Sequence, residues 1–319
     1  MTKMGKLSII IPCYNVSSTI EKCLSSLLLL NKQDLELICI DDGSKDDTLD
    51  ILKKYEKLDN RIIVLCQENA GQAVARNQGL NVATGKFITF VDSDDYIDHH
   101  LYNAMLKNIN QSPDFDMLIF GYEILSKDGQ SLEVRVDKKL GDCQDFVMKF
   151  LEDEGDFIGG YSWNKMFKKA ILAENCFFDM KFEDIPFVFN QIMSSNKITY
   201  YPVPIYKYIQ HPNSTVRTFN RKNLLDRIKA LVMVNEVVKS NKKYDALLIK
   251  YNLLYLLKAY RLNQLCLGDQ EVDKEINDRM PRKQVLTNPL ITTRLKIKYL
   301  LYKFNLLKYA IRVNNRVKE

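Results

Sequence analysis

Four short apolar runs, separated by stretches of helical periodicity, restrict this chain to a small set of folds. The runs are rich in β-branched residues and bounded by Asp, Asn or Gly, as buried parallel strands are, and they cover residues 7–11, 35–40, 62–66 and 87–91. Between them Ser17/Ser18 and Asp46/Asp47 are placed to cap two helices, and residues 70–82 supply a third. The order βαβαβαβ predicts an α/β fold whose mostly parallel central sheet is flanked by helices.

Composition excludes several classes of protein. No apolar run approaches the roughly 18 to 20 residues of a membrane-spanning helix, and the short apolar stretch at residues 7–11 has no cleavage site behind it, so we expect neither a transmembrane segment nor a signal peptide. Seven cysteines without a C-x-x-C pair indicate buried thiols in a reducing cytosol. With only three His, a structural zinc site is not expected, and any metal should prefer carboxylates.

The strands are followed by polar segments, and in parallel sheets ligands bind beyond the carboxyl ends of the strands. Asp92-Ser93-Asp94-Asp95 follows the fourth run and crowds three carboxylates at its end. A divalent cation there would relieve their repulsion and bridge to a diphosphate. The alternative is that Ser93 or Asp95 merely caps the next helix.

Two other polar segments match neither the common calcium-binding motif nor the common nucleotide-binding motifs. Asp41 and Asp42 open an acidic stretch that lacks the EF-hand spacing, so one of these carboxylates either accepts a hydrogen bond from a nucleobase imide or belongs to a helix cap. Gly71 opens a helix that carries Arg76, which suits an anion or a base. Neither the G-x-G-x-x-G nor the Walker spacing is present.

Glu183 and Asp184 stand before an expected helix among aromatic residues. Apolar surroundings raise a carboxyl pKa and suit a general base, while an acid in this position is also an ordinary helix cap.

Taken together, these motifs resemble the family 2 inverting glycosyltransferases, which have a Rossmann-like GT-A fold. The resemblance covers residues 5–215 and rests on six segments: 8–15 (SIIIPCYN), 41–44 (DDGS), 69–77 (NAGQAVARN), 92–95 (DSDD), 163–165 (WNK) and 183–184 (ED). It implies a catalytic domain at 1–215, with a nucleotide-binding half at about 1–95 and an acceptor half at about 96–215, followed by a helical region at 216–319.

The resemblance also assigns roles. It places a nucleobase among Pro12, Tyr14, Asn15 and Asp42, with Asp41 the less favoured neighbour, and it assigns the rest of the nucleotide sugar to Asn69, Gly71, Arg76, Asp92 and Ser93. Asp94, with Asp92, would bind Mn²⁺ or Mg²⁺ on the diphosphate. Asp184, oriented by Glu183, would deprotonate the acceptor hydroxyl.

Three further residues have weaker assignments. Trp163 either stacks on a sugar or belongs to the core, and Lys165 would reach an anionic oxygen. His211 is either a metal or phosphate contact or an ordinary surface residue.

The C-terminal tail is strongly basic. Residues 281–319 hold ten Lys or Arg and one acid, a net charge of +9 that leaves −3 for the rest of the +6 chain. An apolar helical face is expected at Ile297, Leu300, Leu301, Phe304, Leu307 and Ile311. It fits an interfacial helix of residues 290–319 on anionic lipid, or packing against the catalytic domain or a second copy of the chain; nucleic acid is disfavoured.

We therefore expect a metal-dependent transferase on the cytoplasmic face of the membrane, which moves a hexose or N-acetylhexosamine from a nucleotide donor, first of all a UDP-sugar. The acceptor would be a glycan or lipid-linked saccharide in capsule, exopolysaccharide or teichoic acid synthesis. The alternatives are a catalytically silent sugar-nucleotide-binding or scaffolding subunit and a sugar-nucleotide pyrophosphorylase. The second would want a Gly-rich basic loop after the first strand, where Pro12-Cys13-Tyr14-Asn15 stands.

Overall fold

The computed structural model describes residues 5–31, 34–110, 114–137, 145–152, 160–172, 177–211, 220–239, 241–281, 284–308 and 310–311. The chain forms two compact units: Met1–Phe146 with Tyr161–His211, and Val147–Gly160 with Pro212–Glu319. The first unit thus ends at His211 rather than at residue 215. Residues 147–160, expected in the acceptor half, group with the second unit.

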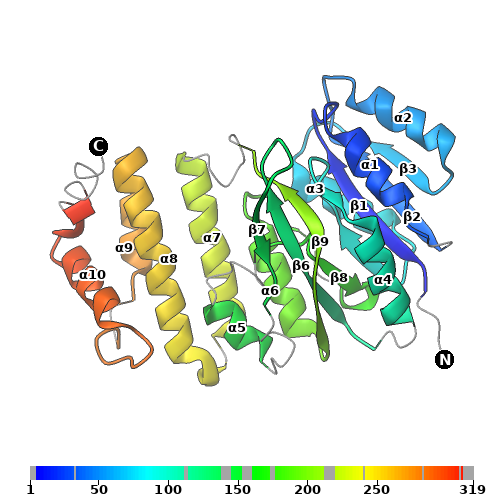
Figure 1. Cartoon of the computed structure of the whole chain (residues 1–319). Coiled ribbons are helices and arrows are strands. Elements are labelled where there is room, and N and C mark those ends of the chain that lie inside the picture. The colour runs from blue at the N-terminus through cyan, green and yellow to red at the C-terminus, as the bar shows by residue number, and fades with distance from the viewer. Residues whose placement is uncertain are drawn as a thin grey trace. The chain divides into compact units, whose positions relative to one another are not determined.

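The first unit is built on a sheet in the order β3-β2-β1-β4-β8-β6-β9-β5, with β7 paired to β6 (Figure 1). Its strands are β1 (Leu7–Cys13), β2 (Leu35–Asp41), β3 (Ile62–Cys66), β4 (Phe87–Phe90), β5 (Tyr96–Ile97), β6 (Met117–Leu125), β7 (Ser131–Arg135), β8 (Lys165–Lys168) and β9 (Ile198–Ile209). Strands β1 to β4 are parallel to one another, as expected, and β1 and β2 are buried along their whole length.

The register of these parallel strands places the polar segments at one edge. Cys13 lies opposite Asp41, and Asp41 lies opposite Cys66, so the segments that follow β1, β2 and β3 leave the sheet side by side. The segment after β4 begins at the same edge, because Val91 donates its backbone N–H to the carbonyl of Ile10. The prediction that the polar segments after these strands share one edge of the sheet is therefore confirmed.

Beyond β4 the sheet is mixed rather than parallel. Strand β8 is antiparallel to both β4 and β6, β5 is antiparallel to β9, and β7 to β6, whereas β6 and β9 are parallel. The strands β5, β7 and β8 were not expected. They have two, five and four residues, and runs this short carry little periodicity.

The helices of this unit are α1 (Ile20–Leu28), α2 (Thr48–Leu58), α3 (Gln72–Val82), α4 (His99–Asn110), the start of α5 (Phe146–Glu152) and α6 (Asp184–Ser194). Helix α3 packs closely on β1, since a Cβ at Gly79 would lie 2.5 Å from Cγ2 of Ile10. The expected cap of α1 at Ser17/Ser18 is wrong: Thr19 is the N-cap and makes no side-chain cap bond. At α2, Asp46 accepts from the backbone N–H of Thr48.

The second unit is helical. It contains the rest of α5 and α7 (Arg221–Val238), α8 (Asp245–Cys266), α9 (Gln270–Arg279) and α10 (Thr293–Lys303). Helix α8 contacts α7, α9 and α10, and the buried core includes Leu231, Leu256 and Ile276. Among the described helices, none is both long and apolar enough to cross a membrane.

The continuous amphipathic helix expected near the C-terminus is interrupted. Helix α10 ends at Lys303, because Asn305 adopts a left-handed backbone with φ of 58°. The expected apolar face is also divided: Leu307 and Ile311 are buried, whereas Ile297 and Phe304 are exposed. Residues 312–319 of the basic tail lie outside the described residues.

The cysteines follow the expectation only in part. Cys13, Cys23 and Cys39 are buried free thiols, while Cys66 and Cys266 are exposed. Cys143 and Cys176 lie outside the described residues.

Candidate active site

Arg76 is the centre of a buried ionic network in the first unit. The residue is 1% exposed, and its guanidinium binds three carboxylates. Nη2 donates to Asp92 at 2.8 Å, and Nη1 donates to Glu183 at 2.5 Å and to Asp184 at 2.9 Å. The planar guanidinium suits this role, because it presents several N–H donors in a fixed geometry. Arg76 therefore joins the segment after β4 to the first turn of α6.

Burial and charge act against each other in this network. Burial by itself lowers the pKa of Arg76, but the carboxylates, Asp184 first, more than reverse this and raise it above its usual value. Burial raises the pKa of Asp92 to about 6, against the opposing effect of Arg76. One guanidinium thus stabilises three acids, of which Glu183 is fully buried, and its removal would leave them without the cation that binds all three.

Glu183 and Asp184 differ in access to solvent. The Glu183 side chain is 1% exposed, and burial together with the charge of Asp184 raises its pKa to about 7 despite Arg76. Its Oε1 also accepts from Gln72. The Asp184 side chain is 14% exposed, and its Oδ2 accepts from both the backbone N–H and the hydroxyl of Ser162 at 3.1 Å. Asp184 is therefore the more accessible acid of the pair.

Asp94 and His211 lie together near this network. His211 Nε2 is 3.6 Å from Asp94 Oδ2, and the Asp94 side chain is 46% exposed. Burial of the carboxyl raises the pKa of Asp94, and His211 opposes this. Within the described residues no group of three His, Cys, Asp or Glu could hold a metal alone. A cation here would depend on oxygens from a ligand as well, and the Asp94 carboxylate suits Mg²⁺ or Mn²⁺.

Asp95 has a structural role. It is 2% exposed, and its carboxylate accepts from the Tyr206 hydroxyl at 2.8 Å and the Ile209 backbone N–H at 2.7 Å. The same hydroxyl accepts from the backbone N–H of Asp92 at 3.1 Å. The Asp95 carboxylate therefore links the 92–95 segment to β9 and does not cap the next helix. That helix, α4, is capped by Asp98, which accepts from two of its backbone N–H groups.

The two acids after β2 have different partners. Asp42 Oδ1 accepts from Gln67 Nε2 and the Ala70 backbone N–H, and Oδ2 accepts from the Gly71 backbone N–H, at 2.7 to 2.8 Å. Asp42 thereby shapes the 69–71 segment, with Gly71 in a left-handed conformation at φ of 91°. Asp41 receives one N–H from Ser44, and its Oδ1 has no hydrogen-bond partner in the described part of the chain.

The segment after β1 lies against the segment after β2. Asn15 has φ of 52°, accepts from the Lys45 backbone N–H at 2.7 Å and donates its own N–H to the Ser44 hydroxyl. Tyr14 beside it is 47% exposed, whereas Pro12 is buried within β1 and Ser93 is 6% exposed. Of the residues expected around a nucleobase, Tyr14 and Asn15 are therefore the most accessible.

Trp163 and Lys165 lie in the core rather than on an acceptor surface. Trp163 is 4% exposed, and its ring stacks between neighbouring tyrosines, with centroids 4.3 Å from Tyr206 and 4.8 Å from Tyr161. Lys165 is fully buried and donates to the Tyr161 carbonyl and Asn164 Oδ1 at 2.6 Å. Burial lowers the pKa of Lys165 to about 7, although Asp184 opposes this. For Trp163 the structure therefore favours the core over the sugar contact, and the expected contact of Lys165 with an anionic oxygen is replaced by contacts within the chain.

Three residues of the network were not found from the sequence: Gln72, Ser162 and Tyr206. Gln72 and Ser162 adjoin motif residues Gly71 and Trp163, so proximity along the chain was an available indication. Tyr206 lies within a strand-like run, and nothing in the pattern sets it apart.

Comparisons with known proteins give similarities in sequence and in fold. The sequence profile of glycosyl transferase family 2 matches residues 8–166. The chain is 27% identical over 271 residues to the putative glycosyltransferase EpsH of Bacillus subtilis, covering 80% of this chain and 77% of that protein. It is 33% identical over 174 residues to a poly(ribitol-phosphate) beta-glucosyltransferase of Bacillus spizizenii, covering 53% of this chain but 26% of that protein.

A solved structure shares the fold. Residues 1–349 of S. aureus TarS, crystallised with UDP, superpose with a TM-score of 0.70 at 19% identity, covering 98% of this chain and 92% of that one. The fold, the ordered motifs and the profile match lead to one assignment: this chain belongs to glycosyl transferase family 2.

Proposed function

We propose that the chain is a metal-dependent, inverting glycosyltransferase that moves a hexose or N-acetylhexosamine from a UDP-sugar to a hydroxyl of a glycan or lipid-linked saccharide. The observation that carries this proposal is the Arg76 network. Through Arg76, this network connects an accessible acid, Asp184, with the segment that contains Asp92 and Asp94. Group transfer from a diphosphate needs a base for the incoming hydroxyl and charge neutralisation for the leaving group, and separate carboxylates supply the two.

In this mechanism the chain's own residues have distinct tasks. Asp184 accepts the proton of the acceptor hydroxyl as its oxygen attacks the anomeric carbon on the face opposite the nucleotide, which leaves as a diphosphate, so the configuration inverts. Ser162 and Arg76 hold the carboxylate in place. Asp94, with Asp92 and His211 beside it, would hold Mn²⁺ or Mg²⁺, which neutralises diphosphate charge when bound.

The nucleotide would lie at the edge formed by the segments after β1 and β2. UDP-sugars are the first donors to test, since TarS was crystallised with UDP and with UDP-GlcNAc. Tyr14 and Asn15 are accessible there, and Asp41 keeps an oxygen without a partner among the described residues, while Asp42 is occupied by the 69–71 segment. We therefore prefer Asp41 to Asp42 as acceptor for a nucleobase imide, the reverse of the order expected from the sequence.

The test is turnover of UDP-, GDP- and dTDP-sugars with and without Mn²⁺. We expect a UDP-sugar to be consumed only with metal, and Asp94→Asn to reduce turnover at least 100-fold because it removes a charged ligand. Asp50→Asn, an exposed acid on α2, is the matched control and should match the wild type. If turnover were the same with Mn²⁺ and with a metal chelator, the proposed metal dependence would be refuted. UDP binding without turnover of any donor would favour the silent subunit, and pyrophosphate-dependent release of a nucleoside triphosphate would favour the pyrophosphorylase.

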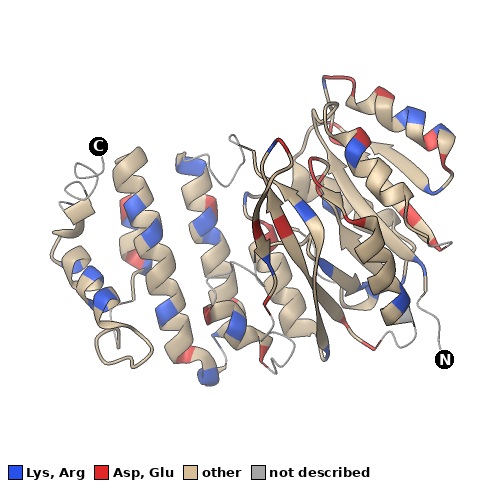
Figure 2. Cartoon of the chain, viewed as in Figure 1, with Lys and Arg blue, Asp and Glu red and all other residues tan. Residues whose placement is uncertain are grey.

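We also propose that α10 contacts an anionic membrane from the cytoplasmic side, where a lipid-linked acceptor would be met. Two apolar side chains there are exposed, Ile297 at 52% and Phe304 at 68%, and exposed Arg294 and Lys298 accompany them. Figure 2 shows α10 carrying basic and no acidic positions. Exposed apolar groups combined with cations suit anionic lipid.

Liposome flotation measures this contact. The double substitution Ile297→Ser/Phe304→Ser should abolish flotation with phosphatidylglycerol vesicles. Substitution is preferred to deletion of residues 290–319, because the deletion would also remove the buried side chains of Leu295 and Tyr299 and expose the core. Leu58→Ser, at an equally exposed site on α2, should float as the wild type does. Unchanged flotation of the double variant would eliminate α10 as the contact.

A further inference from the structure

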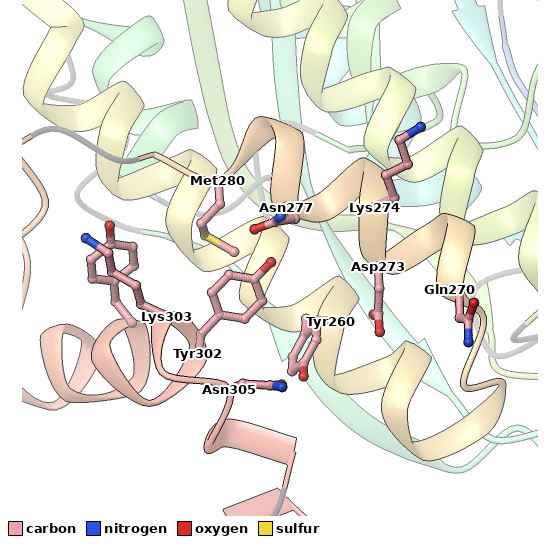
Figure 3. A pocket seen from close by; sticks show the side chains of 10 residues that line it. Tyr260, Gln270, Asp273, Lys274, Asn277, Met280, Tyr302, Lys303 and Asn305 are labelled. Atoms are coloured by element: carbon pink, nitrogen blue, oxygen red, sulfur yellow. The ribbon is translucent and has the colours of Figure 1, made fainter.

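The helical second unit contains a cavity of about 640 Å³ that includes no residue of the Arg76 network (Figure 3). Its volume falls in the range of small-ligand sites, roughly 300 to 1,000 Å³. Helices α8, α9 and α10 and the turn after α10 line it, through Tyr260, Gln270, Asp273, Lys274, Asn277, Met280, Tyr299, Tyr302, Lys303 and Asn305.

Aromatic rings form one part of the lining. Tyr302 is partly exposed and meets Tyr260 edge to face, with centroids 4.8 Å apart, which fixes the orientation of both rings. Figure 3 shows these two rings next to each other, with Asn305 beside them. Tyr260 and Tyr299 are largely buried, at 6% and 4% exposure. Tyr302 is therefore the most exposed of the three rings.

Carboxamides form the polar part of the lining. The side chains of Gln270, Asn277 and Asn305 are exposed, and no hydrogen bond from them to another described residue is present. Asp273 differs, because its two oxygens accept from Asn263 and Gln264 at 2.8 Å. Three amides, each with donors and an acceptor, thus remain for a ligand.

This combination selects among ligand classes. A lipid chain would need a mainly aliphatic lining, and Met280 is the single aliphatic side chain in it. Inorganic phosphate is the competing ligand, because Lys274 and Lys303 also line the cavity, although the N–H groups at the start of α9 donate to Asp269 and are not available to it. A saccharide presents C–H faces to an aromatic ring and hydroxyls that both donate and accept, as carboxamides do.

We propose that this cavity binds a saccharide unit of the acceptor glycan, as a second glycan site in addition to the transfer site. The inference rests on the proposed function, since an acceptor glycan is a substrate only if the chain is a transferase. Attachment of a long acceptor at a second point raises its effective concentration at the first. Long acceptors should therefore have a lower KM than short ones, with no difference in donor use.

The probes are glucose, N-acetylglucosamine, cellohexaose and chitohexaose, measured by saturation-transfer NMR and calorimetry. We expect at least one hexasaccharide to bind, and Tyr302→Ala and Asn277→Ala to weaken its binding about tenfold. Asn277 is exposed on α9, so its substitution tests the site even where Tyr302→Ala unfolds the unit. Leu286→Ala, an exposed apolar residue of the second unit outside the cavity, is the control and should leave sugar binding unchanged.

The inference is overturned if none of the four sugars binds, or if both cavity variants bind them as the wild type does. UDP binding and donor turnover are measured on the same proteins and should be unchanged in the cavity variants. If the wild type turned over no donor, the proposed function would be refuted. The sugar-binding result would still decide whether the cavity is a glycan site.

Discussion

Replacing Arg76 with Met should lower the free energy of unfolding of the first unit by about 3–5 kcal/mol, the usual cost of leaving buried charges without their partner. The variant would keep Asp92, Glu183 and Asp184 close together without the guanidinium that binds all three. Trp163 is the sole Trp of the chain and lies buried in this unit, so its fluorescence in urea titrations reports on the correct unit.

The loss of stability in Arg76→Met should depend on pH. Carboxyls whose pKa is raised by folding bind more protons in the folded than in the unfolded state, so stability falls as pH rises through that interval. For Asp92 and Glu183 in the wild type the interval runs from their unfolded values, about 4, to about 6 and about 7. Without Arg76 the folded values rise further, so the difference from wild type should be larger at pH 8 than at pH 5.5.

Two comparisons make this result specific. Lys54→Met removes one partner of an exposed pair with Glu21 and should change stability by less than about 0.5 kcal/mol. Arg76→Lys keeps the charge but not the planar arrangement of donors, and should lie between wild type and Arg76→Met. An equal loss at pH 5.5 and pH 8 would assign the effect to packing rather than to charge.

Asp184→Asn should reduce transfer by a factor of about 10² to 10⁴, the usual contribution of a general base, and leave UDP affinity within about twofold. The substitution keeps the size of the side chain and one of the two oxygens that accept from Ser162 and Arg76, but the amide cannot accept the proton of the acceptor hydroxyl. Single-turnover transfer with saturating donor isolates this step, and calorimetry measures UDP binding.

Ser162→Ala provides the graded comparison. It removes one of the two bonds that Ser162 donates to Asp184 and keeps the backbone N–H, so a smaller loss of transfer is expected. If Asp184→Asn kept more than a third of wild-type transfer, Asp184 would not be the base. Glu183 would then be the next carboxyl to test, although it is almost completely buried.

The sequence was sufficient to predict that the candidate acids and the polar segments after β1 to β4 lie where strands end or a helix begins. Strands β1 to β4 are long enough, and buried enough, for their periodicity to be read, and a parallel register places the segments after these strands at one edge. Asp92, Asp94, Glu183 and Asp184 were therefore identifiable from their position after a strand or before a helix.

The partners of those acids came only from the tertiary structure. Arg76 lies 107 residues from Glu183 along the chain, and nothing local distinguishes a guanidinium that binds a nucleotide from one that binds three carboxylates. The sequence left Trp163 either on a sugar or in the core, and it placed Lys165 near an anionic oxygen. The structure decides for the core in the case of Trp163, whose ring stacks on tyrosines of β9, at Tyr206 and Tyr208.

By itself, then, the sequence determined the α/β pattern, the polar edge and the acids that suit group transfer, because strand burial and helix periodicity are local properties. The tertiary structure decided that Arg76 joins the acids, that Asp42 is occupied by the 69–71 segment, and that a cavity lies among α8, α9 and α10. Each of these depends on side chains that are distant along the chain and meet only when the backbone has folded.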